Sequence, residues 1–155
     1  ARGVKGIKLK PQDFVIDMVK GDDERSLLTI TEKGYGKRTK IGEYRLINRG
    51  GSGVINLKCT EKNGKVVAVR SVTEADQVIV ISKNGIIIRT PVKDISEIGR
   101  STQGVKVMNI GEGDKVIAAA KIATDTLVSS ESEDEGKVNK EKTNSSTDES
   151  ITHNQ

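Results

Sequence analysis

The sequence predicts an all-β protein built from repeated sheets. Two observations carry this prediction: an internal repeat of about fifty residues, and short β-branched runs bounded by turn residues. KGYGKRTKI, which begins at Lys33, returns as NGIIIRTPV, which begins at Asn84, with matching Gly, Arg and Thr residues 51 positions apart. A period of this length made of short strands is typical of propellers and β-solenoids, whose units bury their apolar faces on one another.

The repeat extends beyond the best-matched stretch. A further series begins at Gly6, Gly53 and Gly104, with spacings of 47 and 51 residues. We expect the longer polar connection at 59–64 to account for the uneven spacing, because the entropy of a loop grows slowly with its length. Other pairs share the offset of 51: Leu27 to Thr31 with Val78 to Ser82, and Val15-Ile16 with Val66-Val67.

Each unit is predicted to contain four strands. In the first unit these are Gly6 to Leu9, Phe14 to Val19, Ser26 to Lys33 and Tyr35 to Ile41. The apolar runs are too short and too rich in β-branched residues for helical repeats. Asn84-Gly85 predicts a two-residue type I′ hairpin turn, since both central residues of that turn need positive φ. Four antiparallel strands make one propeller blade.

The number of units predicts an incomplete ring. Two units plus the trailing piece from Gly104 to Ile122 cannot close a ring of four to eight blades. We therefore expect residues 1–122 to form a partial ring, starting with part of a blade at 1–10, that belongs to a longer protein. A short open solenoid is the alternative.

The C-terminal segment differs in composition. Residues 123–155 are rich in Ser, Thr, Glu, Asp and Lys, and such a segment buries too little apolar surface to fold, so we expect a disordered acidic tail. The net charge of +4 divides into +9 for residues 1–122 and −5 for this tail. A basic body predicts a polyanionic partner, for whose binding surface the tail would compete.

The chain carries few groups suited to catalysis or metal binding. Cys59 has no second cysteine to pair with, and His153, the only histidine, lies in the predicted tail. The cluster Asp22-Asp23-Glu24 is interpreted as a solvated turn, and no Walker, Gly-x-Ser-x-Gly or HExxH motif occurs. The sequence contains no run of eighteen apolar residues, so it predicts no membrane span. We therefore expect a binding surface with no catalytic residue, metal site, cofactor or membrane contact.

The cations of the repeat make duplex DNA the expected partner. The three aromatic residues, about 2% of the chain, are too few to stack unpaired bases, whereas duplex phosphates need only cations, hydroxyls and amides. Cations follow the hairpin of each unit at matched positions, so we expect them to form a stripe along one rim; ordinary solvated surface charges are the alternative. Substituting Arg38 or Arg89 is expected to weaken binding to all sequences alike. The candidate contacts are Lys37, Arg38, Lys40, Arg45, Arg49, Arg89, Lys93 and Arg100, with the amides of Gly50 and Gly51.

A family resemblance follows from longer stretches. KGYGKRT, GVINLK, NGKVVAVRSV, DQVIVIS and IIIRTPVKDISEIGRSTQGVKVM closely resemble the C-terminal domain of DNA gyrase A, from about Gly3 to Ile122. The resemblance implies the last two and a half blades of a six-bladed β-pinwheel, whose blades exchange strands and whose basic rim wraps duplex DNA. In that family wrapping supports ATP-dependent negative supercoiling by a type IIA topoisomerase, and in some relatives an acidic tail regulates wrapping.

Two departures limit what the resemblance implies. The family's wrapping box, Gln-Arg-Arg-Gly-Gly-x-Gly, belongs to the first blade, and the stretch from Arg49 to Gly53 is a partial copy preceded by Ile47-Asn48. The catalytic tyrosine belongs to the other half of gyrase A, and neither Tyr35 nor Tyr44 lies in a matching motif.

The resemblance thus implies a non-catalytic DNA-binding part of a cytoplasmic, nucleoid-associated bacterial enzyme, with ATP and magnesium used elsewhere. The implied partners are duplex DNA, the remainder of gyrase A, and gyrase B, in an assembly of two copies of each. The C-terminal domain of the corresponding topoisomerase IV protein and a propeller scaffold for acidic proteins remain alternatives.

Overall fold

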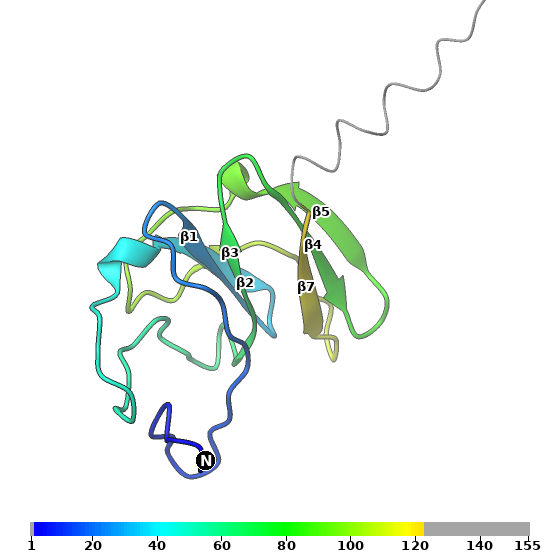
Figure 1. The fold of residues 1–155 in the computed structure, drawn as a ribbon. Helices are drawn as coiled ribbons and strands as arrows, with labels where there is room; N and C mark the ends of the chain where they lie inside the picture. The colour runs from blue at the N-terminus through cyan, green and yellow to red at the C-terminus, as the bar shows by residue number, and fades with distance from the viewer. Residues whose placement is uncertain (1, 123–155) are drawn as a thin grey trace, which may run out of the picture.

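Two antiparallel sheets lie side by side in the computed structural model, which describes residues 2–122 (Figure 1). The first sheet has the order β3-β1-β2-β6 and the second has the order β5-β4-β7. Two single-turn 3-10 helices, η1 and η2, follow β2 and β5. The all-β prediction is confirmed. The elements are β1 (Ser26–Thr31), β2 (Tyr35–Lys40), η1 (Ile41–Glu43), β3 (Val66–Val72), β4 (Gln77–Ser82), β5 (Ile87–Pro91), η2 (Val92–Asp94), β6 (Val105–Lys106) and β7 (Val116–Ile122).

Neither sheet is made from the strands of one unit of the repeat. The β1-β2 hairpin of the first unit pairs on one edge with β3, from the second unit, and on the other with β6, from the third. The β4-β5 hairpin of the second unit pairs in the same way with β7, from the third unit. A blade made of one unit's own strands is therefore wrong, and the exchange of strands that the family resemblance implied is present.

The core lies where the two sheets meet. β4 alternates between buried and partly exposed residues, because one face of the sheet packs inward. β3 and β7, the exchanged strands, contact one another, and they bring small residues such as Ala68 and Ala119 into the core. The core cluster also contains Leu28, Ile30, Val72, Val78, Val80, Val92, Ile95, Met108 and Val116.

Two predicted strands do not form. Residues 6–9 and 14–19 are irregular, although the corresponding Val66–Val72 is strand β3. The reason is the exchange of strands: β3 pairs with the hairpin of the unit before its own, and residues 2–122 contain no hairpin before Ser26. The N-terminal stretch therefore lacks a ladder partner, and Phe14 stands 68% exposed.

The turn between β4 and β5 also differs from the prediction. Asn84 does not have positive φ, which excludes a type I′ turn, whereas Gly85 has a φ of 85°. The Gly85 N–H donates to the Ser82 carbonyl at 3.1 Å, and in the first hairpin the Gly34 N–H donates to Thr31 in the same way at 3.0 Å. This geometry is typical of the longer hairpin loop, in which a glycine in the left-handed region follows a tight turn.

The two hairpin glycines provide a matched prediction about stability. An alanine at Gly34 would place Cβ 2.2 Å from the Met108 carbonyl oxygen, whereas at Gly85 nothing lies within 4 Å. Both substitutions put a side chain at positive φ, which costs about 1–2 kcal/mol. We expect Gly34→Ala to cost about 1–3 kcal/mol more than Gly85→Ala, because it also overpacks a backbone contact. Urea unfolding of both variants measures the difference, and equal losses would contradict the packing at Gly34.

Candidate nucleic-acid interface

The excess positive charge of the body lies in three largely irregular stretches, the last of which includes the short strand β6. We call them the cation loops: residues 2–10, 44–60 and 98–111. They contain nine Lys and Arg residues and no Asp or Glu. The rest of residues 1–122 contains fourteen basic and fourteen acidic residues, which cancel. The net charge of +9 therefore resides in these loops. Their cations are Arg2, Lys5, Lys8, Lys10, Arg45, Arg49, Lys58, Arg100 and Lys106.

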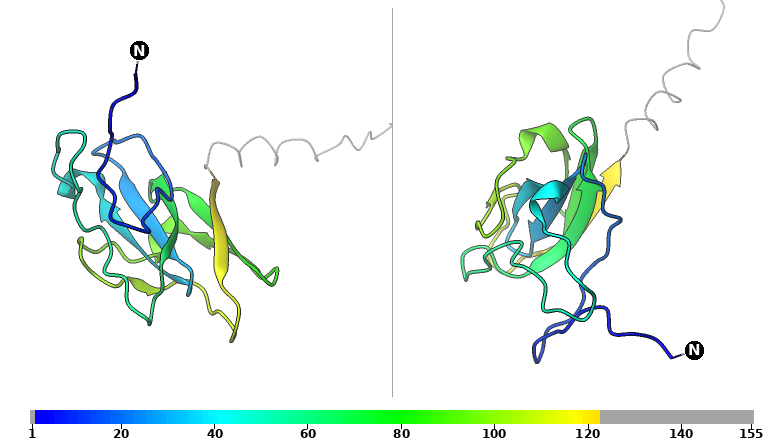
Figure 2. Two further views of the ribbon diagram at one scale, coloured as in Figure 1. Left: turned by 90° about the horizontal axis from the view of Figure 1, so that it is seen from below. Right: turned by 60° about the vertical axis from the view of Figure 1, so that its left-hand side comes forward.

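Backbone hydrogen bonds join the cation loops in series. The Gly50 N–H donates to the Gly6 carbonyl at 2.7 Å, and Lys8 donates to Gly51 at 2.8 Å. One unit further along the chain, Ser101 donates to Asn56 at 3.0 Å and Lys58 to Thr102 at 2.9 Å. The two contacts are equivalent, so each loop docks on the next in the same way. Figure 2 shows the N-terminal stretch, in dark blue, near the teal stretch that follows η1.

This docking corrects the register of the repeat. The Gly6 and Asn56 carbonyls accept equivalent hydrogen bonds, so residues 6 and 56 correspond. The glycine series therefore begins at Gly3, which lies 50 residues before Gly53, and not at Gly6. The connection at 59–64 is consequently only one residue longer than its counterpart, since the offset changes from 50 to 51 across it.

The turns of the last two loops also repeat their backbone conformation. Gly50 and Ser101 occupy the same position and both have positive φ, at 79° and 56°, and Gly53 and Gly104 both have a φ of 78°. The Gly50 amide, however, is already bonded to Gly6, and Gly51 contributes its carbonyl to Lys8. The Gly50 amide, which was predicted to contact a phosphate, is therefore already used in holding two loops together.

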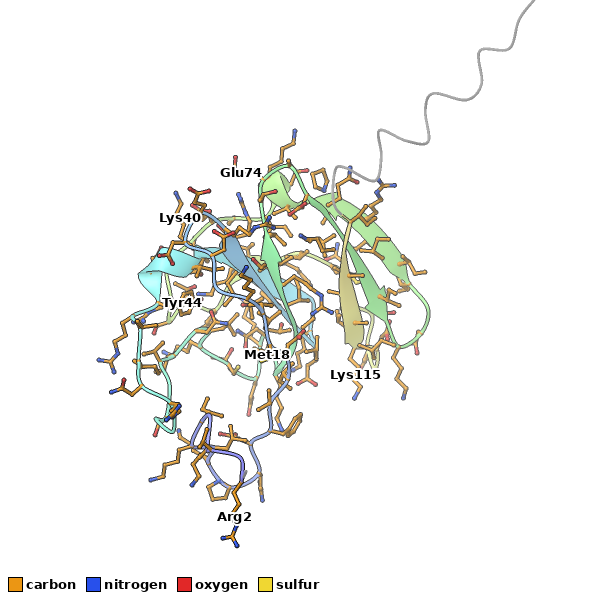
Figure 3. The ribbon with its side chains drawn as sticks, viewed as in Figure 1. Arg2, Met18, Lys40, Tyr44, Glu74 and Lys115 are labelled. Carbon is orange, nitrogen blue, oxygen red and sulfur yellow. The ribbon has the colours of Figure 1, made fainter. Side chains whose placement is uncertain are left out.

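Three of the predicted cations lie in the cation loops. Arg45 and Arg49 are exposed, and Arg100 is half-buried with its guanidinium 5.8 Å from the centre of the Tyr44 ring. Tyr44 lies at the outer edge of the molecule below η1, whereas Arg2 projects from the opposite end of the loop region (Figure 3). The loops that carry these side chains are joined by backbone hydrogen bonds from one unit to the next.

Three others lie outside the loops but remain exposed. Lys40 ends β2, and its ammonium is 3.8 Å from Glu97. Arg89 lies on β5, where its Nε donates to the Gln77 side chain at 2.5 Å. Lys93 lies in η2 and is exposed. Glu97 offsets the charge of Lys40, so its contribution to an anion-binding surface is smaller than that of the loop arginines.

Lys37 and Arg38 are buried, which contradicts their predicted place on the rim. Arg38 is 5% exposed and Lys37 is 0% exposed. The Arg38 guanidinium donates to the Ile95 carbonyl at 2.7 Å, to Lys93 at 3.4 Å and to the Glu74 carboxylate at 3.3 Å. The Lys37 ammonium donates to the Gly99 carbonyl at 2.7 Å, and burial lowers its pKa. Neither side chain can reach a phosphate in this arrangement.

The contrast between Arg38 and Arg89 explains why the repeat misled the prediction. Both residues follow the hairpin at the same position, so the sequence treats them as equivalent. The acceptors of Arg38 belong to the next unit, and no such segment runs along β5 within residues 2–122. Burial at this position is therefore decided by the neighbouring unit.

Six cations of the loops were missed by the sequence analysis. They lie outside the hairpin-following stretch that the repeat emphasised. A signal was nevertheless present, because each loop is a run of nine or more residues without an acidic side chain in a chain that is 31% charged. The missed residues are Arg2, Lys5, Lys8, Lys10, Lys58 and Lys106.

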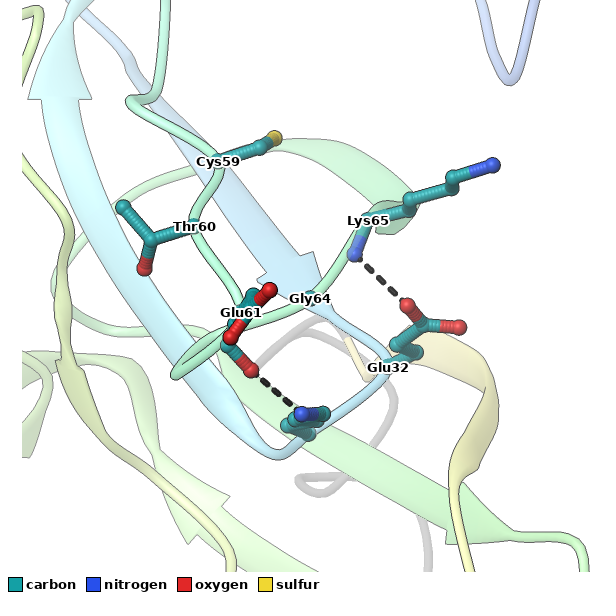
Figure 4. Close-up of a pocket in the computed structure, with 7 residues that line it drawn as sticks. Glu32, Cys59, Thr60, Glu61, Gly64 and Lys65 are labelled. Atoms are coloured by element: carbon teal, nitrogen blue, oxygen red, sulfur yellow. Dashed lines mark hydrogen bonds between the residues drawn. The ribbon is translucent and has the colours of Figure 1, made fainter.

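An open hollow beside the first hairpin contains Cys59 but no arrangement suited to catalysis (Figure 4). Glu32 accepts the Lys65 N–H at 2.9 Å, and Lys33 donates to the Glu61 carbonyl.

Within residues 2–122 no three His, Cys, Asp or Glu side chains gather as a metal site would require, and no helix there is long and apolar enough to cross a membrane. The carboxylate of Asp22, from the acidic cluster, accepts a hydrogen bond from the Arg25 Nε at 3.1 Å across a turn. His153 and the predicted tail lie outside the described residues.

The fold and the loops define a class: an all-β repeat protein whose propeller-like units exchange strands and align basic loops. The chain belongs to the family described as DNA gyrase C-terminal domain, beta-propeller, whose sequence profile matches residues 1–20, 25–73 and 76–123. The two interruptions, at 21–24 and 74–75, directly precede the β1-β2 and β4-β5 hairpins, so the matched blocks follow the repeat. The family resemblance is confirmed.

Individual relatives agree with this assignment. The chain is 45% identical over 124 residues to the DNA gyrase A protein of Staphylococcus epidermidis (strain ATCC 12228 / FDA PCI 1200), covering 79% of this chain and 14% of that one. It is 48% identical over 118 residues to the DNA gyrase A protein of Haloquadratum walsbyi (strain DSM 16790 / HBSQ001), covering 75% and 14%. The chain therefore spans about a seventh of the length of these relatives.

Solved structures share the fold. A DNA gyrase A C-terminal domain superposes with a TM-score of 0.71 at 31% identity, over 77% of this chain and 41% of that one. The C-terminal domain of a DNA topoisomerase IV superposes with a TM-score of 0.72 at 22% identity, over 79% and 38%. The second likeness shows the fold alone, so it does not favour topoisomerase IV over gyrase.

Proposed function

We propose that the cation loops bind the phosphate backbone of duplex DNA. The observation that carries this proposal is the placement of the charge: nine cations and no acid lie in three loops that are hydrogen-bonded in series. Each phosphate contact releases condensed counterions, so a basic surface of this kind binds a polyanion without reading its sequence. Membership of the gyrase C-terminal domain family supports the assignment to DNA.

The aromatic residues favour duplex over single-stranded DNA. Tyr35 is covered by the ammonium groups of Lys62 and Lys106, at 5.7 and 5.9 Å from its ring centre, and Tyr44 by Arg100. Phe14, the third aromatic residue, is 68% exposed and lies in the irregular N-terminal stretch. Recognition of unpaired bases depends on stacking on aromatic platforms. The loops offer cations in place of stacking surfaces.

We further infer that the chain is a non-catalytic DNA-wrapping part of a type IIA topoisomerase, with gyrase as the parent enzyme. Equivalent loops of successive units would present cations along a continuous path, and a duplex that follows it must bend. ATP, magnesium and strand cleavage would belong to the remainder of gyrase A and to gyrase B in the bacterial cytoplasm. The acidic tail at 123–155 would compete with DNA for the loops.

The salt dependence of DNA binding tests this function. We expect the affinity of the 155-residue chain for a duplex to fall about a thousandfold between 50 and 200 mM salt, if about six phosphates are contacted. Fluorescence anisotropy with a labelled duplex measures the slope, and unlabelled single strands of equal length should compete poorly. Affinity that is independent of salt would contradict the proposal. Displacement by polyglutamate as effective as displacement by DNA would instead favour a scaffold for acidic proteins.

A further inference from the structure

Three consecutive residues of β2 bond to the backbone of the next unit. The Lys37 ammonium donates to the Gly99 carbonyl at 2.7 Å, and the Thr39 hydroxyl donates to the Ile98 carbonyl at 2.7 Å. On the opposite face of the strand, Arg38 donates to the Ile95 carbonyl at 2.7 Å. Lys37, Arg38 and Thr39 together thus hold the segment 93–99, which we call the clamped segment.

Backbone hydrogen bonds align the clamped segment with β2. The Arg38 N–H donates to the Ser96 carbonyl at 2.9 Å, and the Ile98 N–H donates to the Arg38 carbonyl at 2.9 Å. Arg38 and Glu97 form a parallel bridge. The clamped segment therefore behaves as a short strand, with side chains of β2 bonding it from both faces.

The charges at this contact are also matched. Glu97 accepts the Ser26 hydroxyl at 2.8 Å and lies 3.9 Å from the Arg38 guanidinium. Lys37 and Thr39 are fully buried, so their hydrogen bonds to the backbone cannot be replaced by water. A buried donor that loses its acceptor suffers the full cost of desolvation, which gives the contact a unique geometry.

The last two residues of the clamped segment, 98–99, are the first two of a cation loop. Gly99, which Lys37 holds, directly precedes Arg100, and Ile98, which Thr39 holds, lies one residue earlier. The guanidinium of Arg100 lies over Tyr44, a residue of the preceding cation loop. The position of Arg100 is thus determined from both sides by the first unit.

We propose that Lys37, Arg38 and Thr39 form a positioning clamp, which sets where one cation loop stands relative to the loop before it. This proposal rests on the proposed function and deepens it: the clamp residues touch no DNA but place Arg100, which does. Arg89 and Thr90 repeat two of the three donors on β5, with Ile88 in place of the lysine. The spacing between loops, and therefore the path of the duplex, is set by contacts between units.

A double-mutant cycle in the 155-residue chain tests the positioning role. Thr39→Val keeps the shape of the side chain but removes the hydroxyl. We expect it to weaken duplex binding about fivefold, as for the loss of one exposed charge contact. It should also lower the slope of log affinity against log salt by up to about 0.9, as for the loss of one phosphate. In an Arg100→Gln background the same change should have no further effect. Equal effects in both backgrounds would overturn the proposal.

Hydrogen exchange tests the clamp without DNA. The amides of Ile98 and Ser101 should exchange faster in Thr39→Val and in Lys37→Met than in the unsubstituted chain. Thr90→Val is the matched control, because it changes the same repeat position on β5, and its exchange in residues 95–104 should be unchanged. Unaltered exchange in both clamp variants would overturn the clamp. Faster exchange in a chain that binds no duplex would refute the proposed function and leave the clamp standing.

Discussion

Arg38→Ala is expected to lower the free energy of unfolding by about 2–4 kcal/mol, because a buried carbonyl left without its donor costs about 1–3 kcal/mol and the cavity adds to that cost. The substitution leaves the Ile95 carbonyl without its donor and removes one of the two cations beside Glu97. It also creates a cavity beside the core, since the guanidinium is 5% exposed. Small domains are stable by only about 5–15 kcal/mol, so a large fraction of the stability is at stake. Thermal and urea unfolding followed by circular dichroism measure the change.

Arg89→Ala is the matched control. It removes the same side chain at the same position of the repeat, but Arg89 is exposed and bonded only to Gln77. We expect its stability to lie within about 0.5 kcal/mol of the unsubstituted chain, as for an ordinary surface substitution. Similar losses for the two variants would show that the contacts of Arg38 with the next unit do not stabilise the fold. Because Arg38→Ala is expected to destabilise the fold, its DNA binding should be measured at a temperature at which the variant is still folded.

Replacing Arg45, Arg49 and Arg100 together with glutamine is expected to weaken duplex binding about a hundredfold at physiological salt, and to lower the salt slope by about 2.7. The reason is electrostatic: three phosphates would lose a cation, and each contributes about 0.9 to the slope. The loss should be the same for duplexes of different sequence, because phosphate contacts carry no base information. Anisotropy titrations at several salt concentrations give both quantities.

An equal change of charge elsewhere separates local contacts from net charge. Three exposed lysines outside the cation loops provide this control. Lys33 lies at the tip of the first hairpin, and Lys65 and Lys115 directly precede β3 and β7. Replacing these three lysines with glutamine should leave the salt slope close to that of the unsubstituted chain. If both triple variants lose affinity equally, overall charge rather than the cation loops governs binding.

The hairpins were predictable from sequence, and the pairing of the remaining strands was not. The pairing of β1 with β2 and the pairing of β4 with β5 join neighbouring parts of the chain, and the repeat and the apolar runs identify both. Whether Phe14 to Val19 becomes a strand depends on a partner hairpin in another unit, which no local pattern records. The hairpin turn was misjudged for a different reason: Asn-Gly favours a two-residue loop, but here the strands end earlier and only the glycine takes positive φ.

The candidate site was predictable in kind but not residue by residue. A basic body indicated a polyanion, and Arg45, Arg49 and Arg100 lie in the acid-free cation loops, with Arg45 and Arg49 exposed and Arg100 half-buried. Lys37 and Arg38 were wrongly placed on the rim because the sequence shows their charge and not the carbonyl groups that surround them. Buried cations are rare without such partners, so exposure was the reasonable expectation. The acid-free runs were the better guide to the surface, since they need no knowledge of neighbouring units.

The exchange of strands places the boundary of the sequence repeat one strand away from the boundary of the folded sheet. β3 belongs by sequence to the second unit, yet it completes the ladder of the first. A chain cut just before Val66 would retain every residue of the first hairpin and still leave β1 with a bare edge. Such an array can therefore be lengthened or shortened by whole copies only if each new copy supplies the closing strand for its predecessor.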